Sequence, residues 1–343
     1  MYSWGDSTSD WKKPGGYKYD SARTPYLDKL ASASAGKGGR TYLNRSSPDM
    51  AIVNPKGQTI STNSEDAIII GVDVTGSMSS WPGEIFDRLP LLYQTLSQYK
   101  PDVEIAFGAI GDATSDRYPL QMTNFGKALT LEDNLNALYG EGGGGGQISE
   151  SYELFGYHIM QHCNMPNAKS PFLFIYGDEK FYPEVNKDQV KEYLGDTLEK
   201  TVASQDVWKG LMQKFNVFYM HKPYGSGGDT GISKEVGNYW KDALGPQRVI
   251  ELPSSDRAVD VAMGIVAKYW GKFGDFTDNI SARHDPKTVA GVAYSIRVIP
   301  NDPADKDHNS VIALPGHDSK KAKSSKSSKS SSSTKTDSMR LDT

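Results

Sequence analysis

Cysteine is almost absent from this sequence. Cys163 is the single cysteine among 343 residues. One thiol cannot form a disulfide within the chain, and it cannot supply a zinc site built from several cysteines. The sequence therefore excludes the disulfide-stapled folds and the cysteine-rich zinc modules. It is consistent with a reducing compartment, and we expect a cytoplasmic protein.

Long apolar runs are absent as well. No stretch approaches the roughly 18 uninterrupted apolar residues that a transmembrane helix requires. The N-terminal segment MYSWGDSTSDWKK has no apolar core of the kind found in secretory signals. We therefore expect neither a membrane partner nor a secretory leader.

Positive charge is scarce in the central part of the chain. Residues 1–60 hold nine Lys and Arg against five Asp and Glu, and residues 318–343 hold seven against three. Each end is thus +4, so with a total of -4 the residues between them carry -12. Contacts to phosphates need Lys and Arg, so we expect no nucleic acid on the folded part. A cation site is compatible with this charge.

Composition divides the chain into four parts. Residues 1–64 show no sustained hydrophobic period and predict an extended or disordered arm, with a short packed piece at Met50–Val53. Residues 65–272 predict one folded domain. Residues 273–317 form an extension in which GVAYSIRVI predicts an extra strand, and the Ser/Lys-rich residues 318–343 predict a disordered tail.

Apolar strands alternate with helical segments between residues 65 and 272. The strand-like runs are AIIIGVDV, VEIAFGAI, PFLFIYG, NVFYMH and RVIELP, and YPLQMTNF reads as a short edge strand. Strands separated by helices of ten or more residues are typical of βαβ crossovers. The sequence therefore predicts an α/β fold: a doubly wound, mostly parallel six-stranded sheet with helices on both faces, Rossmann-like in type.

Aspartates follow three of these strands at the point where each strand ends. Asp73 closes the first strand, Asp112 follows the second and Asp178 follows the third. Ligands of open α/β sheets bind beyond the carboxyl ends of the strands. Like charges that converge there repel one another unless a cation lies between them. Oxygen ligands favour a hard ion, Mg²⁺ first, with Mn²⁺ or Ca²⁺ as alternatives.

Each aspartate taken alone is more simply a cap at a strand-to-helix turn. The combination is harder to explain by capping, because Thr75 and Ser77 follow Asp73 at alternate positions and add two hydroxyls. The pattern D-x-T-x-S, together with two further strand-end aspartates, therefore favours a cation site.

The segment DVTGSMSSW resembles the metal-ion-dependent adhesion site, D-x-S-x-S, of von Willebrand factor A (vWA) domains. The resemblance covers residues 65–272 and implies that Asp73, Thr75 and Ser77 are metal ligands. It gives Asp178, in FIYGDE, the role of a further ligand and places Asp112 close by. The glycine-rich loop GEGGGGGQISE lacks the usual metal-binding Thr, and Gln147 stands at the matching position, with Ser149 near it.

The resemblance implies a non-enzymatic adaptor, in which a partner protein presents an Asp or Glu to the metal. Intracellular members of the family often work beside AAA+ ATPases of the MoxR type, so such an ATPase is an expected partner. The alternative is a Mg²⁺-dependent phosphoryl-transfer enzyme or phosphatase that uses Asp73 and Asp178. Thr75 stands where a second catalytic Asp would be needed, and a phosphate-binding G-x-x-x-x-G-K-[ST] loop is missing. A third possibility is a metal that only rigidifies the loops.

Overall fold

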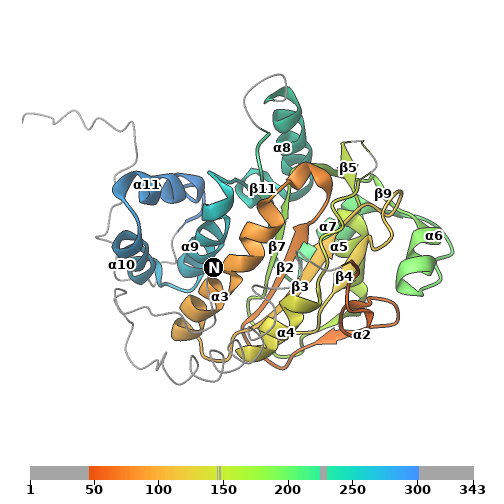
Figure 1. Cartoon of the computed structure of the whole chain (residues 1–343), viewed down its shortest axis with the longest axis horizontal. Helices are drawn as coiled ribbons and strands as arrows, with labels where there is room; N and C mark the ends of the chain where they lie inside the picture. The colour runs from red at the N-terminus through yellow and green to blue at the C-terminus, as the bar shows by residue number, and fades with distance from the viewer. Residues whose placement is uncertain (1–45, 145, 147, 225–229, 301–343) are drawn as a thin grey trace, which may run out of the picture.

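A six-stranded sheet forms the centre of the protein (Figure 1). The computed structural model describes residues 46–144, 146, 148–224 and 230–300. The strand order is β12-β11-β7-β2-β3-β4. The strands span Ala67–Asp73 (β2), Glu104–Ile110 (β3), Leu120–Met122 (β4), Phe172–Gly177 (β7), Asn216–His221 (β11) and Val249–Glu251 (β12).

The central strands are buried on both faces. All seven residues of β2 and all six of β7 are buried. Alternate residues of β2 point to two separate apolar clusters, Ile68 and Ile70 to one and Ala67 and Ile69 to the other. Continuous apolar runs in the sequence thus mark strands that are covered from both sides.

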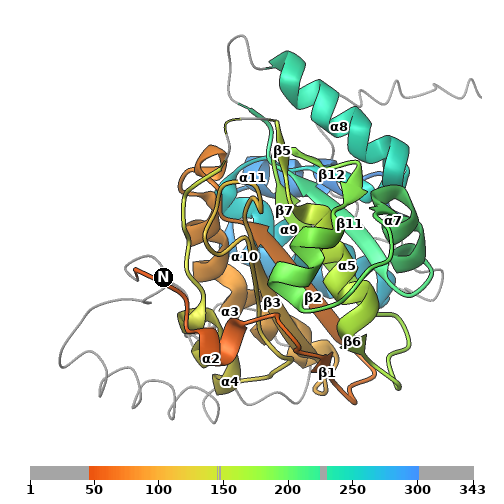
Figure 2. The ribbon, with the colours of Figure 1, turned by 90° about the vertical axis from the view of Figure 1, so that its right-hand side faces the viewer.

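Helices cover both faces (Figures 1 and 2). One apolar cluster joins the sheet to α3 (Trp81–Tyr99), α4 (Leu129–Ala137), α9 (Ala258–Tyr269), α10 (Phe273–Arg283) and α11 (Pro286–Ser295). The other joins it to α5 (Tyr152–His162), α7 (Ser204–Met212) and α8 (Thr230–Leu244). The short α6 spans Lys187–Gln189.

The predicted fold class needs correction, because the sheet is mixed. Four strand pairs are parallel, but β4 runs antiparallel to β3, with Gly108 opposite Met122 and Ile110 opposite Leu120. Only residues 111–119 join these two strands. A parallel return needs a crossover of about a dozen residues or more, so this link forces the antiparallel direction. The doubly wound, mostly parallel sheet of vWA or Rossmann-like type is therefore wrong as predicted.

The extra strand predicted in GVAYSIRVI is also wrong, because this segment lies largely in helix α11. Asp285 caps the helix by accepting hydrogen bonds from the amides of Lys287 and Thr288, and Pro286 stands at its first position. Val289 and Val292 pack into the core beside α9. Residues 273–299 therefore complete the main fold instead of forming an appended strand.

Part of the predicted N-terminal arm is ordered. Met50–Val53 form the one-turn helix α2, and Val53 is fully buried. The strand β1 (Ile60–Ser61) pairs in parallel with β6 (Cys163–Asn164). The rest of the predicted arm, residues 1–45, and the predicted tail, residues 318–343, lie outside the described residues.

Two further short strand pairings lie outside the main sheet. They join β5 (Ser149–Glu150) to β8 (Lys180–Phe181), and β9 (Glu184–Val185) to β10 (Val202–Ala203). Among the described helices, none is both long and apolar enough to cross a bilayer.

Candidate functional site

The turn after β2 holds the first part of the site. Asp73 is the last residue of β2 and is completely buried. Its Oδ1 accepts hydrogen bonds from the amide of Thr75 at 2.8 Å and from the Thr75 hydroxyl at 2.6 Å. A short helical turn, Gly76–Met78, then carries Ser77 back toward the same point. The alternate spacing of these residues therefore gathers their oxygens on one side of the turn.

Ser77 connects this turn to the neighbouring strand. Its hydroxyl lies 3.2 Å from the Thr75 hydroxyl and donates to Oδ1 of Asp178 at 2.9 Å. Asp178 directly follows β7, which pairs with β2, and is completely buried. The structure thus brings Asp73, Thr75, Ser77 and Asp178 together at the carboxyl edge of the sheet.

The glycine-rich loop lies against this turn, as the sequence predicts. The amide of Gly76 donates to the carbonyl of Gly143 at 2.7 Å, and the amide of Gly142 donates to the carbonyl of Val74 at 3.0 Å. A Cβ atom on Gly76 would lie only 3.1 Å from the Gly142 carbonyl oxygen, so this close approach favours glycine. Gln147, the predicted ligand of this loop, lies outside the described residues.

Asp112 is not brought to the Asp73 carboxylate. Its own loop satisfies it: Oδ1 accepts from the amide of Thr114 at 3.0 Å, and Oδ2 accepts from the Thr114 hydroxyl at 2.5 Å. The hydroxyl of Tyr182 also donates to Oδ1, at 3.1 Å. Asp112 therefore belongs to a neighbouring loop and acts on the site only through its charge.

Two glutamates that the sequence analysis missed extend the acidic region. Glu150 lies next to the glycine loop, since a Cβ atom on Gly144 would be 3.1 Å from its Oε1 and 3.5 Å from Thr75 Cβ. Glu179 directly follows Asp178. Both side chains are buried, and Oε2 of each has no hydrogen-bond partner in the described structure. The sequence points to these glutamates only weakly: Glu150 follows the glycine run, and Glu179 is the last residue of GDE.

The crowding of buried carboxylates raises their pKa values. Burial, followed by the charge of Asp178, raises the pKa of Asp73 to about 7. Burial and the nearby charges of Asp73 and Glu179 raise the pKa of Glu150 to about 10. Burial and Asp178 raise the pKa of Glu179 to about 7. Each of these groups would ionise more readily with a cation beside it.

Two further residues that the sequence analysis missed contact the aspartates. Tyr152 donates its hydroxyl hydrogen to Oδ2 of Asp73, and Lys222 donates from Nζ to Oδ2 of Asp178 at 2.6 Å. Tyr152 begins α5, and Lys222 follows β11. Lys222 was detectable in principle, because it directly follows the strand-like run NVFYMH. No local pattern in the sequence points to Tyr152.

Close packing of α5 on the sheet positions Tyr152. Gly71 in β2 and Gly108 in β3 leave room for the ring of Phe155, which would lie 2.7 Å and 2.8 Å from Cβ atoms at these positions. Phe155 is one turn along α5 from Tyr152 and is completely buried. These two glycines therefore bring the start of α5 within reach of Asp73.

Four of the six predicted residues, Asp73, Thr75, Ser77 and Asp178, are spaced like the ligands of a small divalent cation. Their oxygens form an unbroken run with spacings of 2.6, 3.2 and 2.9 Å. Adjacent ligands around Mg²⁺, at about 2.0–2.1 Å from the ion, lie about 2.9 Å apart in an octahedron. Among the described residues, no group of three or more His, Cys, Asp or Glu is arranged to hold a metal. A cation here would rely on two carboxylates and two hydroxyls.

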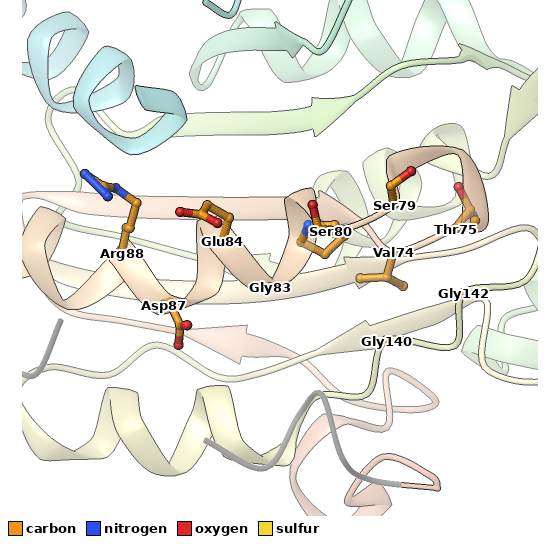
Figure 3. Close-up of a pocket in the computed structure, with 12 residues that line it drawn as sticks. Val74, Thr75, Ser79, Ser80, Gly83, Glu84, Asp87, Arg88, Gly140 and Gly142 are labelled. Atoms are coloured by element: carbon orange, nitrogen blue, oxygen red, sulfur yellow. The ribbon is translucent and has the colours of Figure 1, made fainter. Parts of the chain in front are cut away.

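A cavity of about 570 Å³ opens beside Thr75 (Figure 3). It lies between the first turns of α3 and the glycine loop, and Figure 3 shows Glu84 and Arg88 farther along α3. The cavity leaves room beside the carboxyl edge for part of another molecule. Its residues include Thr75, Ser79, Ser80, Glu84, Gly140 and Gly142.

Comparison with known proteins gives only distant likenesses. No protein-family model matches the chain. No curated protein matches it either. The solved structures with some similarity include the pilus adhesin SpaC from Lactobacillus rhamnosus GG in its open conformation, with a TM-score of 0.43 and 13% identity over 64% of this chain. This chain covers 31% of that adhesin, so it spans about a third of its length.

Two other solved structures show similar levels of likeness. Proximal thread matrix protein 1 from the mussel byssus has a TM-score of 0.42 and 10% identity, and the alignment covers 62% of this chain and 48% of that chain. A variant of the PilB minor pilin from Streptococcus sanguinis has a TM-score of 0.37 and 8% identity, with coverage of 61% and 62%. These structures are described as an adhesin, a thread protein and a pilin, and none is described as a vWA domain.

Proposed function

We propose that Asp73, Thr75, Ser77 and Asp178 bind a divalent cation of the Mg²⁺ type, and that a carboxylate of a partner protein docks on this cation. The observation that carries the proposal is the unbroken run of oxygens from Asp73 to Asp178, with neighbours 2.6–3.2 Å apart. When bound, the cation would supply a Lewis-acidic contact for the partner. The protein residues would hold it with fixed geometry and little net charge.

The pairing of two carboxylates with two hydroxyls supports docking. Mg²⁺ normally retains several waters and binds few protein carboxylates, which leaves positions that an incoming Asp or Glu can take. The cavity beside Thr75 offers room for the chain that carries this carboxylate. The resemblance of the motif to vWA adhesion sites agrees with this reading. It makes a MoxR-type AAA+ ATPase one candidate partner in the cytoplasm.

Lys222 gives the second candidate function a specific observation in its favour. A Mg²⁺-dependent phosphoryl-transfer enzyme or phosphatase needs a cationic side chain to stabilise developing charge, and Lys222 Nζ lies 2.6 Å from Asp178. Asp73 would then be the nucleophile. Thr75 occupies the position where an acid/base would be needed, so we favour the non-enzymatic adaptor.

The test is affinity capture with the full chain, in Mg²⁺ and in EDTA, followed by mass spectrometry. We expect wild type to retain a protein selectively in Mg²⁺, and Asp73→Ala to lose it while circular dichroism shows an intact fold. Ser77→Ala should weaken capture, because it removes one hydroxyl. Asp102→Ala is the matched control, since Asp102 is exposed and precedes β3 at the opposite edge of the sheet.

Each alternative has its own outcome in the same experiment. Capture that persists equally in EDTA or in Asp73→Ala would contradict docking through a metal. Mg²⁺-dependent hydrolysis of a generic phosphoester that disappears in Asp73→Ala would instead establish the enzyme. Loss of folding in EDTA, with no captured protein in Mg²⁺, would leave the metal a purely structural role.

A further inference from the structure

Lys222 places an ammonium group inside the candidate cation site. Its Nζ donates to Oδ2 of Asp178 at 2.6 Å and to the carbonyl oxygen of Ser77 at 2.8 Å. The lysine side chain is only 11% exposed, and Asp178 is completely buried. Lys222 therefore ties the turn after β2 to the end of β7, across the same gap that a cation would bridge.

This ammonium is the charge partner that Asp178 already has. The described hydrogen-bond donors to Asp73 are neutral: the amide and hydroxyl of Thr75 and the hydroxyl of Tyr152. The salt bridge of Asp178 is made with Lys222. An ammonium and a divalent ion carry charge of the same sign and would share the Asp178 carboxylate, so they repel one another at short range.

We propose that Lys222 is a built-in counter-ion that competes with the divalent cation for Asp178 and thereby sets the metal affinity of the site. This inference rests on the proposed function. With the lysine in place, Asp178 keeps a charge partner when no metal is bound. The metal would take Oδ1 of Asp178 while Nζ holds Oδ2, and the repulsion between the two cations across one carboxylate weakens metal binding.

The aromatic ring of Tyr224 gives the repelled lysine a second place to bind. Nζ lies 5.2 Å from the ring centre of Tyr224, whose hydroxyl donates to Oε1 of Glu179 at 3.2 Å. A short swing would bring the ammonium onto the face of this ring. Lys222 would then remain at the rim of the site while the metal occupied its centre.

The experiment measures Mn²⁺ binding to the full chain by calorimetry and by the electron paramagnetic resonance signal of free Mn²⁺. We expect Lys222→Met to lower the Kd for Mn²⁺ at least tenfold relative to wild type. Lys222→Gln, which keeps a donor to Asp178 without the charge, should shift the Kd in the same direction. Lys127→Met is the matched control, because Lys127 pairs with Asp102 at the opposite edge of the sheet. Its Kd should equal that of wild type.

The outcomes separate this inference from the proposed function. If wild type binds Mn²⁺ and neither Lys222 variant binds more tightly, the inference is overturned and the metal site stands. If wild type binds no Mn²⁺ but both variants do, the inference is supported and metal-dependent docking by the natural protein is contradicted. If no variant binds Mn²⁺, both are overturned. Circular dichroism of each variant, in EDTA and in Mn²⁺, shows whether the variant is folded.

Discussion

The hydroxyl of Tyr152 donates a hydrogen bond to Oδ2 of Asp73. Tyr152 is the first residue of α5 and Asp73 the last of β2, so this contact joins a helix to the strand end that it covers. Both side chains are completely buried. Burial, followed by the charge of Asp73, raises the pKa of Tyr152 well above its usual value, so the hydroxyl stays a donor at neutral pH.

Tyr152→Phe should destabilise the protein by about 1.5–3 kcal/mol, the range for hydrogen bonds to charged groups. The variant keeps the ring but leaves Oδ2 of Asp73 without this donor in a buried place. Urea unfolding measures the effect. The control is Tyr219→Phe, because the Tyr219 hydroxyl is also buried but donates to the neutral carbonyl of Glu179 at 3.0 Å. Equal destabilisation by the two variants would contradict a special role for the Asp73 contact.

Gly177→Ala should disturb the same contact from the other side. A Cβ atom at this position would lie 2.1 Å from the Tyr152 hydroxyl oxygen and 2.7 Å from Cζ, so the ring must move. We expect a loss of about 1–3 kcal/mol, as for other overpacked cores. Gly291→Ala in α11 is the control, because a Cβ atom there meets nothing within 4 Å. The change in melting temperature relative to wild type should differ between the two variants in sign or clearly in size. Equal melting temperatures would refute the clash.

The sequence predicts the strand ends of the site better than it predicts what surrounds them. Buried strands are visible in the sequence as apolar runs. An aspartate at the end of such a run lies at the sheet edge, because the strand ends there. Asp73 and Asp178 were found in this way. Tyr152 reaches Asp73 only because Gly71 and Gly108 admit Phe155, and such a contact between distant segments leaves no periodic signal.

The two incorrect predictions about the fold, the direction of β4 and the strand in GVAYSIRVI, have similar causes. The direction of β4 follows from the short link to β3, which the apolar pattern does not weigh. The segment GVAYSIRVI is apolar enough for a strand. Its helical conformation follows from Asp285 and Pro286, which precede it in the sequence and start α11. In this segment the capping residues therefore indicate the secondary structure better than the β-branched residues that follow them.

Glu150→Gln should make the protein less sensitive to alkaline pH. Burial and neighbouring carboxylates raise the pKa of Glu150 to about 10, so the folded protein keeps a proton that the unfolded chain releases near pH 4.5. Stability attributable to this group therefore falls as the pH rises from 4.5 toward 10, by at most about 1.4 kcal/mol per pH unit. The glutamine side chain does not titrate, so the variant lacks this loss of stability.

Melting temperatures of wild type and Glu150→Gln, measured from pH 5 to 9, test this directly. The advantage of the variant over wild type should grow as the pH rises. The exposed Glu184 supplies a control substitution, Glu184→Gln, whose curve should run parallel to that of wild type. Parallel curves for Glu150→Gln as well would mean that Glu150 ionises as readily in the folded protein as in the unfolded chain.

His158 should make the protein sensitive to acid. The side chain is completely buried in α5, and neither ring nitrogen has a hydrogen-bond partner among the described residues. Burial, followed by the charge of His162, lowers the pKa of His158 to about 4. Between pH 6.5 and 4, His158 binds a proton in the unfolded chain but stays neutral in the folded protein. Stability therefore falls as the pH falls through this range, by up to about 1.4 kcal/mol per unit.

His158→Phe removes this proton while keeping a ring to stack on His162, whose centre lies 5.3 Å away. From pH 6.5 to 5 the wild type should lose about 1.6 kcal/mol more than the variant, or about 3–6 °C in melting temperature for a folded domain of this size. His221, also buried with a pKa lowered to about 4, leaves the variant some residual sensitivity. If both proteins lose the same number of degrees, His158 is protonated in the folded state and must have a partner that compensates its charge.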